Sequence, residues 1–292
     1  MSEEIPRLLQ RITSFLDLLE PLLPHTGRID FAKSSAWRWR SDQFSGELQE
    51  ITRLNTIELN DLKHIDAQKE LLVRNTEQFL ANLPANNALL WGPRGTGKSS
   101  LVKAILNEYG EKGLKIIEVE RDHLVDLPKI IDCVNESDPE QANKYIVFCD
   151  ELSFDEKDNT YRALKVVLDG SILATPDNII IYATSNRRHL VPEKLRDNLD
   201  AKFDSEGEIH QSEAVEERIS LSERFGLWVS FHPYNQDRYL EIVEHWLGTL
   251  GEAFTSEAKT AALQWALLHG SRSGRSAQQF ARDWAGQQQL KR

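Results

Sequence analysis

The feature that most constrains this chain of 292 residues is one glycine-rich segment, Gly92-Pro93-Arg94-Gly95-Thr96-Gly97-Lys98-Ser99. It fits the pattern G-x-x-x-x-G-K-[ST] at every fixed position. A short apolar run at 88–91 precedes it, and a helical pattern at 99–109 follows. Glycines let a backbone wrap closely enough around a polyphosphate for several N–H groups to point at it. The context therefore favours a phosphate-binding loop over a glycine-rich turn with a chance lysine.

The chemistry of this segment predicts roles for its last residues. The start of the following helix, including Ser100, adds the positive end of a helix dipole. Lys98 would reach the β- and γ-phosphates, and Ser99 would offer a hydroxyl to Mg²⁺. We therefore expect residues 92–100 to bind a nucleotide.

A second apolar run, at 145–149, ends in two carboxylates, Asp150 and Glu151. In α/β proteins the carboxyl ends of the strands are where ligands bind. Asp150 would hold Mg²⁺, directly or through water, and Glu151 would orient and activate the attacking water. The alternative is a solvated loop after a strand. Because the pair follows a phosphate loop by some fifty residues, we favour the catalytic and metal-binding roles over a solvated loop.

A third apolar run, at 179–183, ends in Thr184-Ser185-Asn186. The amide of Asn186 could hold the water or the γ-phosphate. By spacing alone, an Asn that caps the next turn fits equally well.

Short apolar runs alternating with helices predict an α/β fold, a parallel sheet with helices on both faces. After residue 232 the pattern is helical to the end, which predicts a C-terminal helical lid. Apolar residues at three- and four-residue spacings over 5–19 predict an amphipathic helix, part of an N-terminal helical extension. We expect the extension at 1–50, the nucleotide-binding core at 51–232 and the lid at 233–292.

The stretch 25–47 reads as a connection or small appendage, and it contains Trp37-Arg38-Trp39-Arg40. Alternating cations and aromatics can stack on nucleic-acid bases. They can equally pack as a hinge, which the shortness of the patch favours. The acidic stretch 197–217 could be a regulatory or partner loop, although such runs are more often simply solvated.

Composition narrows the class of protein. The formal net charge of −11 excludes a global basic field for nucleic acid but not a local patch. Two cysteines, Cys133 and Cys149, exclude a disulfide scaffold and indicate a reducing, cytoplasmic setting. No apolar run approaches the roughly 20 residues of a membrane span. The acidic first residues do not resemble a signal peptide.

The ordered set of phosphate loop, Asp-Glu strand, polar strand end, Arg-Phe-Gly segment and basic helical lid resembles the AAA-plus ATPases. In detail, the segments GPRGTGKSSLVKA, FCDELSF, IYATSNRRHLVPE and SERFGLWVSF are similar to one bacterial family of predicted AAA-plus ATPases. The resemblance runs from about Ile51 to the C-terminus.

The resemblance implies roles that spacing does not show. Asn186 matches the sensor-1 position, Arg224 the arginine finger and Arg275 the sensor-2 arginine of the lid. Residues 59–68 resemble the segment that lines the adenine pocket, although His64 stands where related ATPases usually carry glycine. A surface ion pair with Glu223 or Glu217 is the alternative for Arg224.

These expectations together indicate an ATPase that uses ATP and Mg²⁺. An arginine finger acting in trans implies a homo-oligomer, and the family implies a protein or nucleic-acid client. An aromatic-apolar-Gly tripeptide, typical of threading loops in unfoldases, is absent between the phosphate loop and Asp150. A nucleotide-gated switch comparable to helicase-loader ATPases is the main alternative, and a small-molecule phosphotransferase is a more distant one.

Overall fold

The computed structural model describes residues 28–41, 46–153, 160, 164–165, 167–168, 176–187, 202–203, 209–210 and 223–291. The predicted helix over 5–19 lies outside these residues, as does nearly all of the acidic stretch 197–217. From that stretch the structure describes only β7 (Lys202–Phe203) and β8 (Ile209–His210), which pair antiparallel. Within the described residues, no helix combines the length and apolar character that crossing a membrane requires.

The core is a seven-stranded sheet in the order β2-β1-β4-β5-β6-β3-β9. Its strands are β1 (Ala36–Ser41), β2 (Gly46–Glu50), β3 (Ala88–Trp91), β4 (Leu114–Glu118), β5 (Lys144–Cys149), β6 (Ile179–Ser185) and β9 (Leu227–Ser230). All neighbours pair parallel except β1 and β2, which pair antiparallel. The predicted α/β class with a parallel sheet is confirmed.

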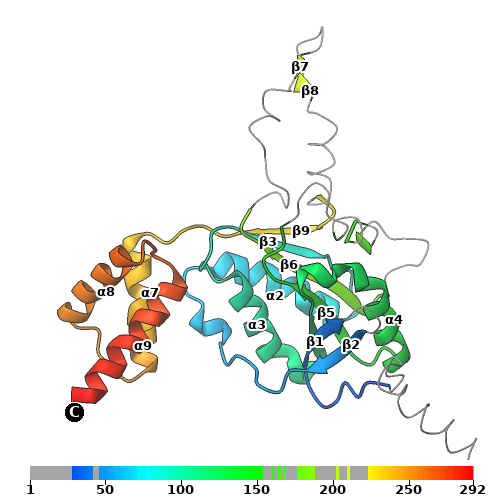
Figure 1. Cartoon of the computed structure of the whole chain (residues 1–292), viewed down its shortest axis with the longest axis horizontal. Coiled ribbons are helices and arrows are strands. Elements are labelled where there is room, and N and C mark those ends of the chain that lie inside the picture. Colours follow the sequence, from blue (N-terminus) through cyan, green and yellow to red (C-terminus); the bar gives the residue numbers. More distant parts are fainter. Residues whose placement is uncertain are drawn as a thin grey trace, which may run out of the picture.

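Helices cover both faces of this sheet (Figure 1). Those of the core are α2 (Asp66–Leu80), α3 (Lys98–Tyr109) and α4 (Leu127–Ser137), with 3₁₀ turns at Leu59–Asp61, Gly110–Lys112 and Arg121–Asp126. Successive residues of β5 alternate between two buried clusters: Ile146 and Phe148 pack with α2 and α3, and Tyr145 and Val147 pack with α4. Because both faces are covered, every residue of β5 is buried and the strand reads as one apolar run.

The segment containing Trp37-Arg38-Trp39-Arg40 corrects one interpretation of the sequence. It is strand β1, paired with β4 in the core sheet, so the sheet begins before Ile51 and the segment is no appendage. Trp37 and Trp39 are only 5% and 2% exposed, which leaves no face for stacking on bases. Arg38 on the other side of the strand lies 2.6 Å from Glu118. The two arginines made this segment read as polar, although it alternates with a period of two and buries its tryptophans on one face.

The C-terminal lid is a bundle of three helices, α7 (Gln236–Thr249), α8 (Ser256–Leu268) and α9 (Gly274–Lys291). It lies beside the core, next to α2 and α3 (Figure 1). Residues 231–235 connect β9 to α7, and Asn235 caps α7 by accepting a hydrogen bond from Arg238 N at 2.9 Å. This short connection brings the lid against the carboxyl ends of the sheet strands.

Candidate nucleotide site

Three neighbouring strands of the sheet deliver their carboxyl ends to one place. The order β5-β6-β3 sets Asp150 after β5, Asn186 after β6 and the phosphate loop, residues 92–99, after β3. Together with the lid they line a cavity of about 200 Å³. The cavity is lined by Ile57, Asp61, Leu62, Lys63, Arg94, Gly95, Gly97, Lys98, Ser99, Ser100, Lys103, Asp150, Glu151, Thr184, Asn186, Tyr234, Ile242, Trp246, Gly274, Arg275 and Gln278.

The glycines of the phosphate loop adopt conformations that other residues resist. Gly92, Gly95 and Gly97 have φ of 141°, 75° and 101°. A Cβ on Gly92 would lie 2.3 Å from the carbonyl oxygen of Phe231. The loop also joins the sheet, because Gly92 N donates to Ser185 O at 3.1 Å. The loop is therefore shaped by backbone contacts that only glycine permits.

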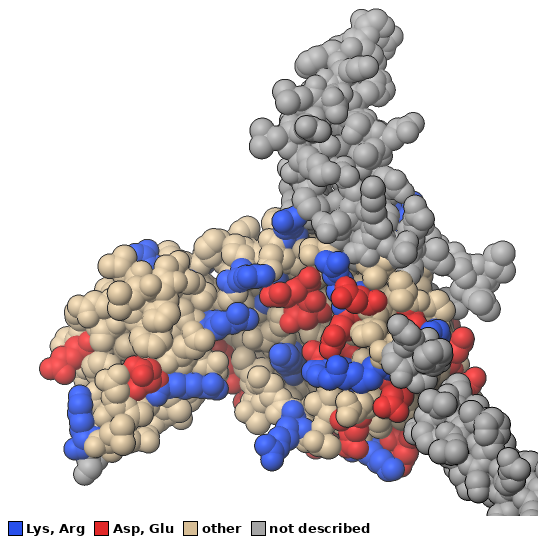
Figure 2. All heavy atoms as spheres, in the orientation of Figure 1, with Lys and Arg blue, Asp and Glu red and all other residues tan. Residues whose placement is uncertain are grey.

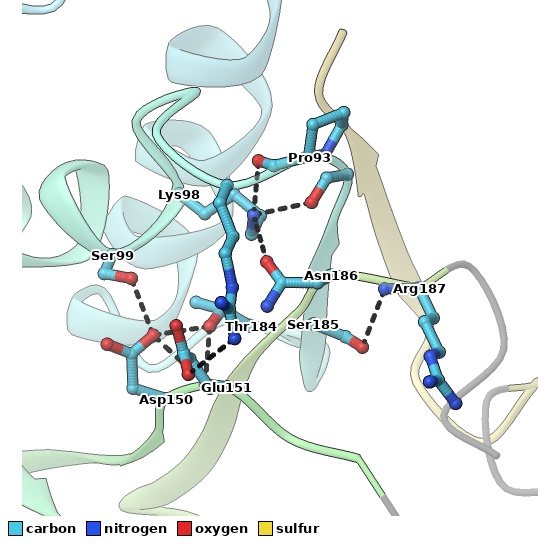
Figure 3. A network of polar contacts seen from close by, with 11 residues as sticks. Pro93, Lys98, Ser99, Asp150, Glu151, Thr184, Ser185, Asn186 and Arg187 are labelled. Carbon is cyan, nitrogen blue, oxygen red and sulfur yellow. Dashed lines mark hydrogen bonds and ion pairs between the residues drawn. The ribbon is translucent and has the colours of Figure 1, made fainter. Parts of the chain in front are cut away.

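Lys98 is the most buried cation of the cavity, at 6% exposure. Its Nζ donates to the carbonyls of Gly92 at 2.7 Å and Pro93 at 2.8 Å, and to Asn186 Oδ1 at 3.3 Å (Figure 3). Burial lowers the pKa of Lys98 to about 8, while the charges of Asp150 and Glu151 oppose that shift. The predicted Lys98 and Asn186 thus meet in the structure.

Asp150 is held by two hydroxyl groups. Ser99 Oγ donates to its Oδ1 at 2.6 Å and Thr184 Oγ1 at 2.5 Å (Figure 3). A hydroxyl and a carboxylate are oxygen ligands of the kind Mg²⁺ takes, so Ser99 and Asp150 fit that ion. Sequence reasoning assigned no role to Thr184. Its signal was modest: the first polar residue at the end of a buried strand.

Glu151 has an unusual backbone and an accessible side chain. Its φ of 55° is left-handed, and its N–H donates to Thr184 Oγ1 at 3.0 Å. Its carboxylate is 57% exposed and lies 3.6 Å from the guanidinium of Arg94, which is 72% exposed. Glu151 therefore faces the open part of the cavity, where a water molecule can reach it.

Apolar side chains also line the cavity. They include Ile57 and Leu62 from the core and Ile242 and Trp246 from α7. Apolar and aromatic side chains of this kind can pack against a planar ring. Asp61, Leu62 and Lys63, from the segment 59–68 expected near adenine, line the same cavity.

The backbone conformation of His64 shows why glycine is usual at this position in related ATPases. Its φ of 62° is the left-handed conformation that glycine favours. His64 Nε2 lies 2.9 Å from Glu241 Oε2 of the lid, and His245 of the lid contacts Asp61 of the core at 3.0 Å. The turn is kept, and the histidine adds a contact to the lid.

The two predicted arginines, Arg275 and Arg224, lie in different parts of the structure. Arg275, near the start of α9, lines the cavity. Arg224 does not, because it precedes β9, which is parallel to β3 with Leu227 opposite Ala88. It thus lies at the amino ends of the strands, opposite the phosphate loop. A further arginine, Arg187, directly follows Asn186, and in Figure 3 its side chain points away from Asp150 and Glu151.

Comparison with known proteins adds a family and a fold. The family model described as "Protein of unknown function (DUF815)" matches residues 32–288. The solved structure of the Thermotoga maritima RuvB Holliday junction branch migration motor superposes with a TM-score of 0.51 at 15% identity, over 77% of this chain and 63% of that one. The Aeropyrum pernix Orc1 protein in complex with DNA gives 0.51 at 16% identity, over 78% and 61%. At such identities the likeness is one of fold alone.

Curated relatives match over shorter shares of their length. Protein CdcH of Halobacterium salinarum is 26% identical over 225 residues, which is 70% of this chain and 28% of CdcH. The replication factor C large subunit of Staphylothermus marinus is 40% identical over 70 residues, which is 24% of this chain and 16% of that protein. The chain therefore spans less than a third of either relative.

Proposed function

This chain belongs to the family described as "Protein of unknown function (DUF815)" and has the AAA-plus ATPase fold, and we propose that it binds Mg-ATP and hydrolyses it to drive or gate remodelling of a macromolecular partner. One observation carries the proposal. The phosphate loop, the buried Lys98, the pair Ser99–Asp150 and the exposed Glu151 all line one cavity. A structural turn would not need a desolvated cation beside two carboxylates.

In the proposed complex the loop amides and Ser100 surround the phosphates, and Lys98 exchanges its carbonyl partners for phosphate oxygens. Ser99 and Asp150 would hold Mg²⁺, which when bound neutralises charge on the β- and γ-phosphate oxygens. Arg275, from the lid, lines the same cavity and lies close enough to Lys98 for its charge to act on that lysine. The apolar side chains, Trp246 among them, take the base.

Hydrolysis needs a water in line with the γ-phosphorus. We assign Glu151 to orient that water and accept its proton as the new P–O bond forms and the bond to the ADP oxygen breaks. Asn186, already hydrogen-bonded to Lys98, would hold the γ-phosphate or the water. The position of Glu151 in the open cavity, beside Arg94, supports this assignment.

The assembly and setting are part of the proposal. Arg224 lies at the strand ends opposite its own phosphate loop, which supports a role as a finger acting on a neighbouring copy. We propose a homo-oligomer on this basis, with the lid, residues 233–292, as the nucleotide-responsive unit. Cys133 and Cys149 are both free thiols, which supports a cytoplasmic setting.

The primary test compares Lys98→Ala and Glu151→Gln with the unaltered protein. Lys98→Ala is expected to weaken Mg-ATP binding by about 10²-fold or more, because a buried charged donor is lost. Glu151→Gln is expected to keep ATP bound but to lower kcat about 10²- to 10⁴-fold, because the general base is lost. Calorimetry and phosphate release measure the two effects.

Matched controls come from the turn Gly110–Lys112, outside the cavity. Lys112→Ala and Glu111→Gln make the same chemical changes and should leave binding and turnover within about twofold. If the unaltered protein binds no ATP in the presence of Mg²⁺, the proposal is wrong.

A second candidate is a nucleotide-gated switch with slow turnover that docks on protein or nucleic acid. The observation that favours it is the similarity to an Orc1 protein in complex with DNA and to a replication factor C large subunit. Slow basal hydrolysis that single-stranded DNA stimulates would favour the switch over a constitutive motor.

A further inference from the structure

The carbonyl groups of the phosphate loop are held by specific donors, and two of those donors belong to the lid. Lys98 takes the carbonyls at the start of the loop. Farther along, Gly95 O accepts from Gly274 N at 2.8 Å, and Thr96 O accepts from the Tyr234 hydroxyl at 2.9 Å. Two consecutive peptide groups of the loop are thus fixed from the lid side.

Because peptide groups are planar, the direction of these carbonyls also fixes the direction of the neighbouring N–H groups. In a trans peptide the C=O of one residue and the N–H of the next point in opposite directions. When Gly274 N and the Tyr234 hydroxyl hold the carbonyls of Gly95 and Thr96, the N–H groups of Thr96 and Gly97 point away from those two donors. These are amides of the loop that would wrap the phosphates.

We propose that Tyr234 is a positioning residue for nucleotide phosphates: its hydroxyl, with the Gly274 amide, orients the N–H groups of Thr96 and Gly97 into the phosphate cradle. Phosphate binding then depends on the lid being seated on the loop. This inference rests on the proposed function, since it concerns how the same site takes its phosphates.

The two lid donors are well anchored. Tyr234 is 9% exposed and immediately precedes Asn235, the cap of α7. Gly274 follows Ser273, whose Oγ accepts from Ser276 N at 3.2 Å and so caps α9. Each donor therefore lies next to the start of a lid helix, and a shift of both helix starts away from the loop would release both loop carbonyls together.

The contact is also close enough to constrain the loop sterically. A Cβ placed on Gly95 would meet the side chain of Ser273 at 2.7 Å, and Gly97 has the Tyr234 hydroxyl 3.9 Å from its would-be Cβ. The lid touches the phosphate loop here, whereas Trp246 and Ile242, which we propose contact the base, belong to α7. Loss of the Tyr234 hydroxyl should therefore affect phosphates and spare the base.

The test is Tyr234→Phe, which removes one hydroxyl and keeps the ring. Its matched control is Tyr239→Phe, because the Tyr239 hydroxyl also donates to a backbone carbonyl of the lid, Ala262 O, at 3.2 Å. Competition against a fluorescent ADP analogue gives inhibition constants for ADP, tripolyphosphate and adenosine. Thermal unfolding of each variant reports the cost to the fold.

Tyr234→Phe is expected to weaken ADP and tripolyphosphate about threefold to tenfold, the range for one net hydrogen bond, and to leave adenosine within about twofold. Tyr239→Phe should leave all three within about twofold, even where its melting temperature falls equally. Equal weakening of adenosine, equal effects of the two variants, or no effect of Tyr234→Phe would overturn the inference. In each of those cases the unaltered protein still binds ADP. Failure of the unaltered protein to bind ADP or ATP would instead contradict the proposed function.

Discussion

Lys98 combines three properties that rarely coexist in a surface lysine: it is 6% exposed, it donates to two backbone carbonyls, and two carboxylates lie near it. Desolvation is the largest of these effects and lowers its pKa to about 8. The group is therefore balanced near neutrality, and a phosphate oxygen that replaces the carbonyls would favour its charged form.

This balance predicts a pH dependence of ATP affinity. Phosphate binds the protonated lysine, so affinity is nearly full at about pH 7, is about halved at pH 8 and falls further as the pH rises. With a pKa of about 8, ATP should bind about tenfold more weakly at pH 9 than at pH 7. Calorimetry at the two values measures the ratio. In Lys98→Arg the guanidinium stays charged, so any binding that remains should vary little. A flat profile for the unaltered protein would contradict the prediction.

Most residues of the candidate site could be predicted from the sequence, and one could not. Lys98, Ser99 and Asp150 were predicted from motif spacing and Asn186 from the family resemblance, and the structure brings them together, although their roles stay predictions. Thr184 was missed, because nothing in a strand sequence says which neighbouring carboxylate its last hydroxyl will meet. Such contacts depend on strand order, which one sequence does not fix.

At the scale of elements, the phosphate loop packs directly against the start of the lid. Gly95 lies at the centre of this contact, with φ of 75° and the side chain of Ser273 against its would-be Cβ.

Strand β1 is an element that the sequence pattern did not predict. Its arginines pair with Glu118 and Glu120 on the exposed side, so charge concealed the buried face of a strand.

Gly95→Ala tests the loop–lid contact. The new methyl group combines a strained backbone with a clash against the start of α9, so ADP affinity should fall about tenfold or more. Gly248→Ala is the control, because no atom lies within 4 Å of its would-be Cβ and it sits in α7. There an alanine should raise the free energy of unfolding by roughly 0.5 kcal/mol. Normal ADP affinity in Gly95→Ala would show that the loop adapts without the lid.

For the whole molecule, net charge says little about any one surface. The chain carries −11, yet Figure 2 shows lysines and arginines interspersed with acids over the core on the face in view. The α/β class and the helical lid were predictable because apolar periodicity determines them. The edge strands and the place of Arg224 relative to the cavity were not, since both depend on how the sheet is ordered.

Arg224 leads to a prediction about assembly. If it completes the site of a neighbouring copy, Arg224→Ala and Lys98→Ala are each inactive, but they are defective in different halves of a shared site. In a heterologous interface, an equal mixture places an intact phosphate loop against an intact finger at about one interface in four. Phosphate release should then recover to roughly a quarter of that of the unaltered protein.

The matched mixture joins Lys98→Ala with Glu151→Gln, whose defects lie in the same half of the site. No pairing of those two variants yields an intact phosphate loop with an intact Glu151, so activity should stay absent at every ratio. Recovery in the first mixture alone requires that one copy supply a residue to the site of another, because no cis arrangement distinguishes the two mixtures. Full activity of Arg224→Ala by itself would remove the finger from the mechanism and leave the cavity to act within a single chain.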